Sequence, residues 1–345
     1  MKTINELLEN FKKDIFETAD VVAALSLSEK DAIPLFHYAE EVCEQTYGKG
    51  VFVRGIIEIS NICRKNCNYC GIRKDNANIK RYRIPFEEVL ETVALIKNDG
   101  VHTIVMQSGE DLKCDEYLPE LIKIIRTQHD VAVTLSTGER PLEVYKQYKD
   151  AGVDRFLLRI ETTDETLFKQ IHPDDNLQYR KECLYLLKEL GFEVGTGIMV
   201  GLPGQTLDSI AEDLYFFRQL QPDMVGIGPF LPQKDTPFKD KKNESLFLTL
   251  KVLALIRIML KDVNLPATTA MGTMDPIGRQ KALKVGANVI MPNYTPLQYR
   301  EHYKLYDKKI CASETCTMAC TSSIVAAAGK YVVEGKGFRK RFPTT

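Results

Sequence analysis

The chain has 345 residues, 44% of them hydrophobic, which suits one large domain with appendages better than two independent domains. Its 46 Lys and Arg residues balance 47 Asp and Glu residues, so it has no electrostatic reason to bind nucleic acid or an acidic membrane. No segment approaches the roughly 18 apolar residues of a membrane helix, and the first residues do not resemble a secretory signal. We therefore expect a cytoplasmic protein that acts on a small molecule.

The spacing of apolar residues divides the chain into three parts. Residues 1–48 have apolar positions at helical spacing and are predicted to form helices. From residue 51, short apolar runs alternate with amphipathic stretches, which indicates β-α units and a parallel sheet. The predicted strands are 51–59, 102–107, 131–136, 154–160, 194–200, 224–229, 265–270 and 287–292. Eight units predict an α/β fold of the (β/α)8 TIM-barrel type over 49–300, with a cysteine-bearing C-terminal extension over 301–345.

Three cysteines, Cys63, Cys67 and Cys70, follow the first predicted strand with the spacing C-x3-C-x2-C. Active sites of barrels lie in the loops after the strands, so this loop is predicted to lie in such a site. Thiolates are the usual ligands of iron-sulfur clusters, and a four-iron cluster normally takes four of them. Three thiolates leave one iron open to another ligand. A structural zinc site is the alternative, but it usually needs a fourth ligand that the neighbouring sequence does not offer.

Polar residues at alternate strand positions are predicted to face the barrel interior. Arg155, Arg159 and Glu161 share one face of the fourth predicted strand, because alternate residues point the same way. The first strand is predicted to place Arg54 and Glu58 inside in the same manner. Buried charges of this kind are costly unless they contact a ligand or one another, so an internal ion-pair network is the structural alternative.

Hydroxyl groups at strand ends are further candidates for binding an anion. They belong to Thr134, Thr268 and Thr269, although threonine also favours strands for structural reasons. The segment MQSGED, residues 106–111, closes the second strand with a glycine beside polar groups. Its backbone N–H groups are predicted to bind a carboxylate, or its acidic side chains an amine.

The C-terminal tail contains a second cysteine group. Cys311, Cys316 and Cys320 have the spacing C-x4-C-x3-C, which predicts a second iron-sulfur cluster. Another metal and free thiols are the alternatives, because the spacing is looser than in the first group. The basic end, KGFRKRF, is predicted to be a solvated surface.

The motif C-x3-C-x-Y-C resembles that of the radical S-adenosylmethionine (SAM) superfamily. Nearly the whole chain resembles one of its families, the [FeFe]-hydrogenase maturases HydE, through segments such as RGIIEISNICRKNCNYCGIRKDN, TIVMQSGED, LLRIET and PATTAMGT. The resemblance implies a 4Fe-4S cluster whose open iron binds SAM, and an electron that cleaves the sulfonium to give a 5'-deoxyadenosyl radical. It also implies a place in assembling the dithiolate-bridged di-iron subcluster from an organometallic iron-carbonyl-cyanide-cysteine precursor. The implied partners are other hydrogenase maturases and a low-potential electron donor.

The same resemblance implies roles for individual residues. Glu161 corresponds to the residue that binds the ribose hydroxyls, and Arg180 to the one that pairs with the SAM carboxylate. The SAM site is completed by Tyr69, Gln107, Ser108, Met199 and Leu202, although core packing is the alternative for the last two. The cavity for the anionic precursor is implied at Arg54, Thr134, Arg155, Thr268, Thr269, Met291 and Tyr303.

Two other functions are compatible with the sequence. A related enzyme, such as a methylornithine synthase or a biotin synthase, would share the barrel and the first cluster. A noncatalytic iron-sulfur scaffold would bind a cluster without cleaving SAM. The tail cysteines and the segments PATTAMGT and PNYTP favour the HydE family over the former, and a nucleoside site at Glu161 and Arg180 argues against the latter.

Overall fold

The computed structural model of the chain describes residues 2–243, 245–310 and 318–340. Its strands are β1 (Gly50–Val53), β2 (Gly55–Ser60), β3 (Thr103–Ser108), β4 (Ala132–Ser136), β5 (Arg155–Leu157), β6 (Glu193–Val200), β7 (Met224–Pro229), β8 (Pro266–Ala267), β9 (Val289–Ile290) and β10 (Tyr331–Val333). The helices before β6 are α1 (Ile4–Lys12), α2 (Thr18–Leu25), α3 (Ile33–Tyr47), α4 (Phe86–Asn98), the 3-10 helix η1 (Leu112–Glu116), α5 (Leu118–Gln128), α6 (Leu142–Asp150), α7 (Glu165–Ile171) and α8 (Leu177–Glu189). The later helices are α9 (Leu207–Leu220), α10 (Leu246–Leu260), α11 (Thr269–Met274), α12 (Gly278–Leu283), α13 (Leu297–Arg300) and α14 (Met318–Ala327).

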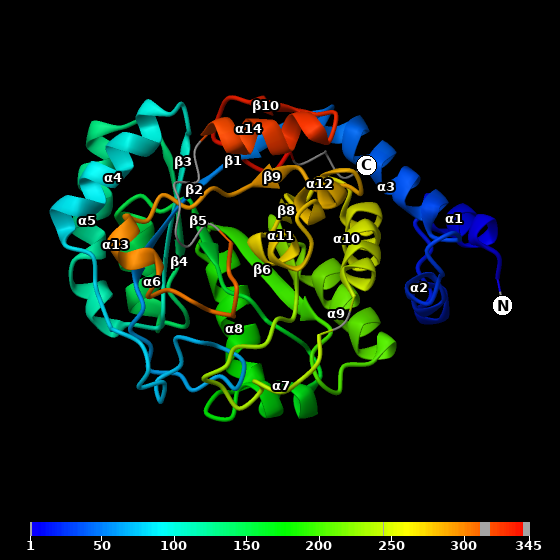
Figure 1. Cartoon of the computed structure of the whole chain (residues 1–345). Helices are drawn as coiled ribbons and strands as arrows, with labels where there is room; N and C mark the ends of the chain where they lie inside the picture. The colour runs from blue at the N-terminus through cyan, green and yellow to red at the C-terminus, as the bar shows by residue number, and fades with distance from the viewer. Residues whose placement is uncertain (1, 244, 311–317, 341–345) are drawn as a thin grey trace.

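The strands form a closed parallel barrel. One sheet has the order β2-β3-β4-β5-β6-β7 and the other the order β10-β1-β9-β8. A bridge between Met224 and Asn264 joins β7 to the segment before β8, and β1 runs directly into β2, so the two sheets close on each other. Helices surround this barrel (Figure 1). The predicted (β/α)8 architecture is confirmed.

The first predicted strand is divided at Arg54, and each half belongs to a different sheet. The half before Arg54 pairs with β9, and the half after it pairs with β3. Hydrogen bonding nevertheless continues across the break, because Arg54 N–H donates to Ile290 O at 3.0 Å and Ile56 N–H donates to Pro292 O at 3.0 Å. This break is where the sheet bends to close the barrel.

Three predicted strands are shorter than expected: the strand predicted over 287–292 is only β9, and the other two end near the candidate site. The segment 265–270 has only two strand residues, because Thr268 caps α11 and Thr269 begins it. Strand β5 stops at Leu157, and the chain then reaches Glu161, whose φ of 64° is left-handed. Where these two strands end early, the chain turns, and polar side chains at the carboxyl ends of both strands lie in the same region.

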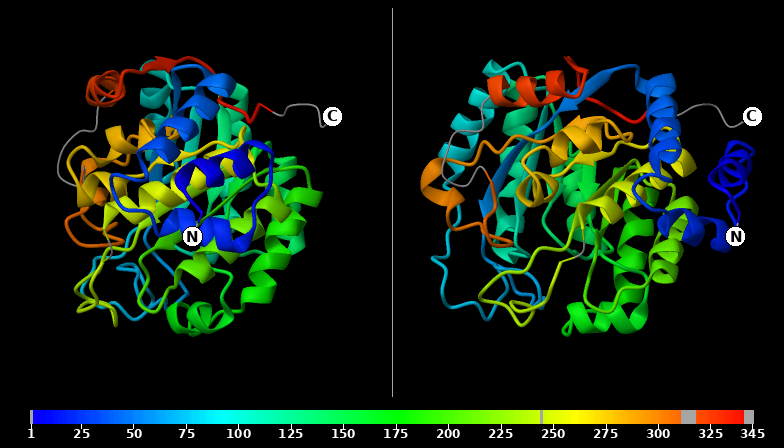
Figure 2. Two further views of the ribbon diagram at one scale, coloured as in Figure 1. Left: turned by 90° about the vertical axis from the view of Figure 1, so that its right-hand side faces the viewer. Right: turned by 45° about the vertical axis from the view of Figure 1, so that its right-hand side comes forward.

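The N-terminal helices predicted for residues 1–48 are present as α1, α2 and α3. They lie on the outside of the barrel beside α9 and α10 (Figure 2). The buried ammonium of Lys251 on α10 donates to the carbonyl oxygens of Leu25 and Leu27, and this ties the end of α2 to the barrel. Within the described residues, no helix is both long and apolar enough to span a membrane.

The tail returns to the amino end of the barrel. Strand β10 pairs in parallel with β1, and α14 lies over this end, opposite the loop after β2 (Figure 1). The prediction of a solvated basic end is wrong for Arg339. Its guanidinium is 2.6 Å from Asp262 Oδ1, and its side chain is only 7% exposed. The tail packs against the barrel because its charged side chains contact carboxylates and backbone carbonyl oxygens at the starts of the barrel strands.

Candidate active site

A cavity of about 360 Å³ opens at the carboxyl ends of the barrel strands. Cavities of this size suit small organic ligands, whose pockets are usually about 300–1,000 Å³. Twelve of the predicted site residues line it: Cys63, Cys67, Tyr69, Cys70, Gln107, Ser108, Glu161, Arg180, Met199, Thr268, Thr269 and Tyr303. They come from many strand ends, as expected for the active site of a barrel.

The three thiols at the mouth of the cavity are free and close enough to influence one another. Burial raises the pKa of Cys67, and the charges of Cys70 and Cys63 raise it further. Burial and the charge of Cys63 raise the pKa of Cys70 to about 12. Three thiolates in this place would repel each other unless a positive centre bound them, so the donor set fits an iron-sulfur cluster.

Within the part of the chain that the structure describes, no three Cys, His, Asp or Glu side chains are placed to hold a single metal ion. A cluster requires a different arrangement, because each thiolate binds a different iron. Backbone donors also meet the first sulfur: the N–H groups of Lys65 and Glu110 lie 3.4 and 3.3 Å from Cys63 Sγ. Such donors stabilise negative charge on a bound thiolate.

Close backbone approaches fix the cysteine loop in place. A Cβ atom at Gly109 would lie 2.2 Å from Ile62 O and 2.8 Å from Cys63 Cβ, so the loop after β3 needs glycine here. The guanidinium of Arg81 donates to the carbonyl oxygens of Asn61 at 2.7 Å and Ile72 at 2.8 Å, on either side of the cysteines. Sequence analysis missed Arg81, whose spacing from the motif carries no signal of this role.

A buried ionic network connects the cysteine loop to the loops after β4 and α7. Lys65 Nζ lies 2.8 Å from Asp175 Oδ1 and 3.2 Å from Glu139 Oε2. Arg180 Nε lies 2.7 Å from Glu139 Oε1, and its Nη2 atom pairs with Asp175. Although burial opposes ionisation, Arg180 and Lys65 lower the pKa of Asp175. The guanidinium predicted to meet the SAM carboxylate is therefore held in a fixed orientation at the cavity wall.

His172, at the end of α7, is a second residue that sequence analysis missed. Its Nδ1 atom lies 3.1 Å from Cys67 Sγ, and its Nε2 atom lies 3.4 Å from the hydroxyl of Tyr69. The side chain is 2% exposed and packs against Phe168 with ring centroids 4.8 Å apart. It lies 105 residues from Cys67, so only the fold brings the two together.

Arg159 and Glu161 line the part of the cavity where the resemblance implies a nucleoside site. They form a two-point ion pair, which agrees with the internal ion-pair alternative, although both lie beyond the end of β5. The turn after Glu161 is held by the buried Asp213 on α9, whose Oδ1 atom accepts hydrogen bonds from Thr163 N–H at 2.5 Å and Thr163 Oγ1 at 2.7 Å. The hydrogen bonds of the residues after Glu161 therefore help to fix its left-handed backbone conformation.

Apart from the tail cysteines, five of the predicted site residues lie outside this cavity. Leu202 packs in a small apolar cluster against which Tyr69 and Met199 also pack. Met291 lines a separate cavity with Glu58 and Lys309. Arg54, Thr134 and Arg155 meet at the amino end of the barrel.

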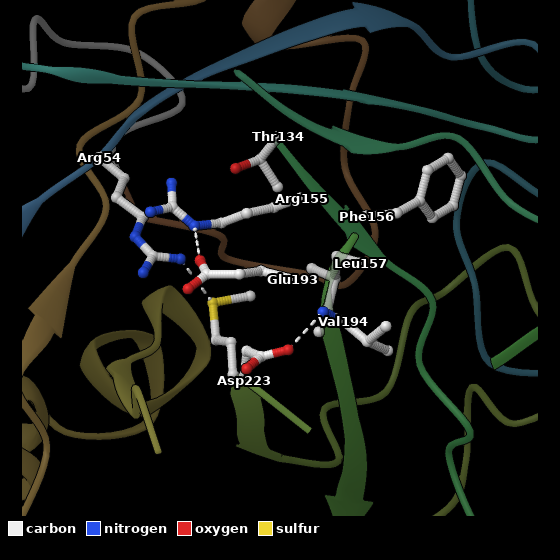
Figure 3. A pocket seen from close by; sticks show the side chains of 10 residues that line it. Arg54, Thr134, Arg155, Phe156, Leu157, Glu193, Val194 and Asp223 are labelled. Carbon is white, nitrogen blue, oxygen red and sulfur yellow. Dashed lines mark hydrogen bonds and ion pairs between the residues drawn. The ribbon is translucent and has the colours of Figure 1, made fainter. Parts of the chain in front are cut away.

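The site at the amino end is small and largely filled by the protein itself. Its cavity is about 10 Å³, roughly the room one water needs. Arg155 Nε is 2.5 Å from Glu193 Oε2 (Figure 3). Arg54 Nη2 donates to Gly337 O at 3.0 Å. Arg54 Nε and Thr134 Oγ1 are buried without a hydrogen-bond partner among the described residues.

Comparison with known proteins places this site in a family. A model described as the radical SAM superfamily matches residues 57–217. The sequence is 47% identical to the [FeFe] hydrogenase maturase subunit HydE of Thermotoga maritima, over 98% of each chain. It is 28% identical to a 3-methylornithine synthase of Methanosarcina acetivorans, over 88% of this chain and 89% of the relative. The crystal structure of methylornithine synthase superposes with a TM-score of 0.85 at 24% identity, covering 95% of this chain and 97% of the other, which shows a shared fold.

The barrel, the three thiols at its mouth and the family match define a radical SAM enzyme. Within that superfamily the chain belongs to the HydE family of [FeFe] hydrogenase maturases. Its cofactors are a 4Fe-4S cluster, for which Cys63, Cys67 and Cys70 are the fitting ligands, and SAM. When bound, the cluster supplies the electron that cleaves SAM reductively to a 5'-deoxyadenosyl radical.

The second predicted cluster is not tested by this structure. Cys311 and Cys316 lie outside the described residues. Cys320 is exposed on α14, at the amino end of the barrel. A second iron-sulfur cluster in the tail remains a prediction.

Proposed function

We propose that this enzyme acts in [FeFe]-hydrogenase maturation on an iron-carbonyl-cyanide-cysteine precursor, during assembly of the dithiolate-bridged di-iron subcluster. The observation that carries the proposal is the 47% identity to HydE over nearly the whole of both chains. The precursor would be supplied by a partner maturase, and a low-potential donor would provide the electron. We expect the work to take place in the cytoplasm, where thiols stay reduced.

The cavity offers separate groups for the two small molecules. We assign the SAM nucleoside to Glu161 and its carboxylate to Arg180, with Tyr69, Gln107, Ser108 and Met199 around them. Thr268, Thr269 and Tyr303 line the same cavity and supply hydroxyls for an anionic precursor. The barrel wall encloses one side of this cavity, and keeping water from that side would protect a reactive radical from quenching.

The small site at the amino end of the barrel has room for a water-sized ligand but not for the organometallic precursor. Arg54 Nε and Thr134 Oγ1 are buried donors without a partner among the described residues, and Arg155 lies beside them. An arginine presents several N–H groups to an anion. Arg54, Thr134 and Arg155 were predicted to hold the precursor, but their cavity is too small for it, so we propose them only as contacts of a water-sized anion. Met291 is proposed to contact the precursor from its neighbouring cavity, which shares Thr269 with the main one.

The test is an anaerobic assay of the protein reconstituted with iron and sulfide. The reduced protein receives SAM, with or without the partner maturase's iron-cysteine product, and 5'-deoxyadenosine and its adducts are quantified. We expect product that rises with the organometallic precursor. Cleavage indifferent to it, or methylornithine formed from lysine, would contradict the proposed substrate.

A matched variant separates precursor binding from SAM cleavage. Thr269→Val removes one cavity hydroxyl at nearly constant volume, far along the chain from the cysteine loop. We expect it to retain basal SAM cleavage and to need several-fold more precursor for stimulation, because one neutral hydrogen bond contributes about 0.5–1.5 kcal/mol. An unchanged precursor dependence would remove Thr269 from the substrate site.

A further inference from the structure

The contact between His172 and the cysteine loop connects a side chain of α7 to a ligand of the cluster. His172 Nδ1 and Cys67 Sγ are 3.1 Å apart, within the distance of an N–H···S hydrogen bond. Other contacts hold the same two segments together: Asn68 N–H donates to Ile171 O at 2.9 Å, and Asn68 Nδ2 donates to Gln170 O at 2.7 Å. The contact therefore belongs to a docked interface between the loop and the end of α7.

The neighbours of the imidazole determine which nitrogen carries the proton. The Tyr69 hydroxyl lies 3.4 Å from Nε2 and can donate to it. A neutral ring that accepts at Nε2 carries its proton on Nδ1, which then points at Cys67. The hydroxyl can equally accept from an Nε2–H group, but a cluster-bound Cys67 thiolate has no proton and can only accept, so in that state the contact requires the proton on Nδ1.

Packing keeps the ring in this orientation. It is tilted by 32° against the Phe168 ring, and the Tyr69 ring meets it edge to face at 5.5 Å. The backbone N–H of His172 donates to Phe168 O at 2.8 Å, so the helix end also fixes the residue. Burial and these contacts restrict the imidazole to the orientation in which Nδ1 faces Cys67.

We propose that His172 donates a hydrogen bond to the Cys67 thiolate and thereby raises the reduction potential of the 4Fe-4S cluster. Reduction adds negative charge to the cluster and its sulfurs. A fixed N–H dipole stabilises that charge, so it favours the reduced form. His172 is in this sense a positioning and tuning residue. The proposal rests on the cluster site, and it is independent of the proposed substrate.

The experiment compares three substitutions in the reconstituted full-length protein without SAM or precursor. His172→Phe keeps an aromatic ring against Phe168 but removes the donor. His172→Asn places an amide nitrogen at the same number of bonds from Cα as Nδ1, and His172→Gln moves the amide one bond further out. For each, iron and sulfide content are measured, and the midpoint potential is read from an anaerobic redox titration followed by electron paramagnetic resonance.

We expect the midpoint potentials of His172→Phe and His172→Gln to fall below that of the wild type at equal iron content. His172→Asn is expected to stay close to the wild-type potential. An unchanged potential in His172→Phe, or an equal fall in His172→Asn, would overturn the proposal. If His172→Phe binds no iron, the contrast between Asn and Gln decides. Loss of the cluster in all three would mean that His172 only builds the loop, which would also overturn it.

Discussion

Arg159 and Glu161 form a two-point ion pair inside the active-site cavity, with Nε to Oε1 at 2.8 Å and Nη2 to Oε2 at 2.9 Å. The guanidinium holds the carboxylate in one orientation, and the left-handed backbone at Glu161 turns the side chain into the cavity. A carboxylate fixed in this way is prepared to accept hydrogen bonds from two neighbouring hydroxyls.

Glu161→Gln should weaken SAM binding. The amide keeps the shape but loses the charge, and a hydrogen bond to a charged group contributes about 1.5–3 kcal/mol. We expect the SAM affinity to fall tenfold or more, measured from the SAM dependence of 5'-deoxyadenosine formation. Glu165→Gln, a change at an exposed residue at the start of α7, is the control and should leave the affinity unchanged.

Gly109→Ala should reduce cluster incorporation. The added methyl group would meet Ile62 O and Cys63 Cβ inside contact distance and push the cysteine loop away. We expect most of the iron and sulfide to be lost after reconstitution, measured per folded chain. Gly100 has a positive φ, unlike Gly109, but an alanine there meets no atom within 4 Å, so Gly100→Ala should cost some stability and keep its iron. Equal iron contents would contradict this account of the loop.

Local sequence patterns predicted the site only where its members are close in sequence or share a strand face. The spacing of Cys63, Cys67 and Cys70 predicted a group of thiols that the fold brings to one cavity, and alternation put Arg159 and Glu161 on one face, although the strand ends before them at Leu157. The alternation along a strand predicts which face a side chain lies on, but not at which end of the barrel it lies. It therefore did not show that Arg54 and Arg155 lie at the opposite end from the active-site cavity.

Residues whose partners are distant in sequence were not predictable. His172 meets Cys67 across 105 residues. Asp213 meets Thr163 across 50 residues. The basic tail was predicted to be solvated because its charge is visible in the sequence, whereas the carboxylate of Asp262 that receives Arg339 is not. Tertiary contacts of this kind follow from the closed barrel rather than from a local pattern.

Asp213 should make the free energy of unfolding depend on pH. A variant that lacks this carboxyl group can test the direction of the dependence. Burial raises its pKa to about 7, against an ordinary value of 3.8. The folded state therefore binds this proton more tightly, so the stabilising contribution is present below about pH 4 and is lost as the pH rises through 7.

Asp213→Asn removes this titration. Between pH 5.5 and 8, the unfolding free energy of the wild type should fall relative to that of the variant, by up to about 1.4 kcal/mol per pH unit. Urea titrations at both pH values measure it. A difference that stays constant with pH would show that Asp213 does not titrate in this range.

Arg339→Ala should destabilise the amino end of the barrel. The substitution leaves the largely buried Asp262 carboxylate without its partner at 2.6 Å. We expect a loss of about 3 kcal/mol in unfolding free energy. Lys336→Ala is the matched control: its partner Asp130 is 86% exposed, so the loss should be within about 1 kcal/mol. Equal losses would mean that the tail is held by other contacts.

The central claim is that the three-thiol loop holds the cluster that cleaves SAM. The most direct measurement is the yield of 5'-deoxyadenosine from reduced, iron-loaded protein, compared between the wild type, Cys67→Ala and Cys43→Ala. Cys43 is buried on α3, away from the cavity. The account predicts turnover in the wild type and Cys43→Ala, and its loss together with the first cluster in Cys67→Ala. Cluster-dependent 5'-deoxyadenosine from Cys67→Ala would contradict it.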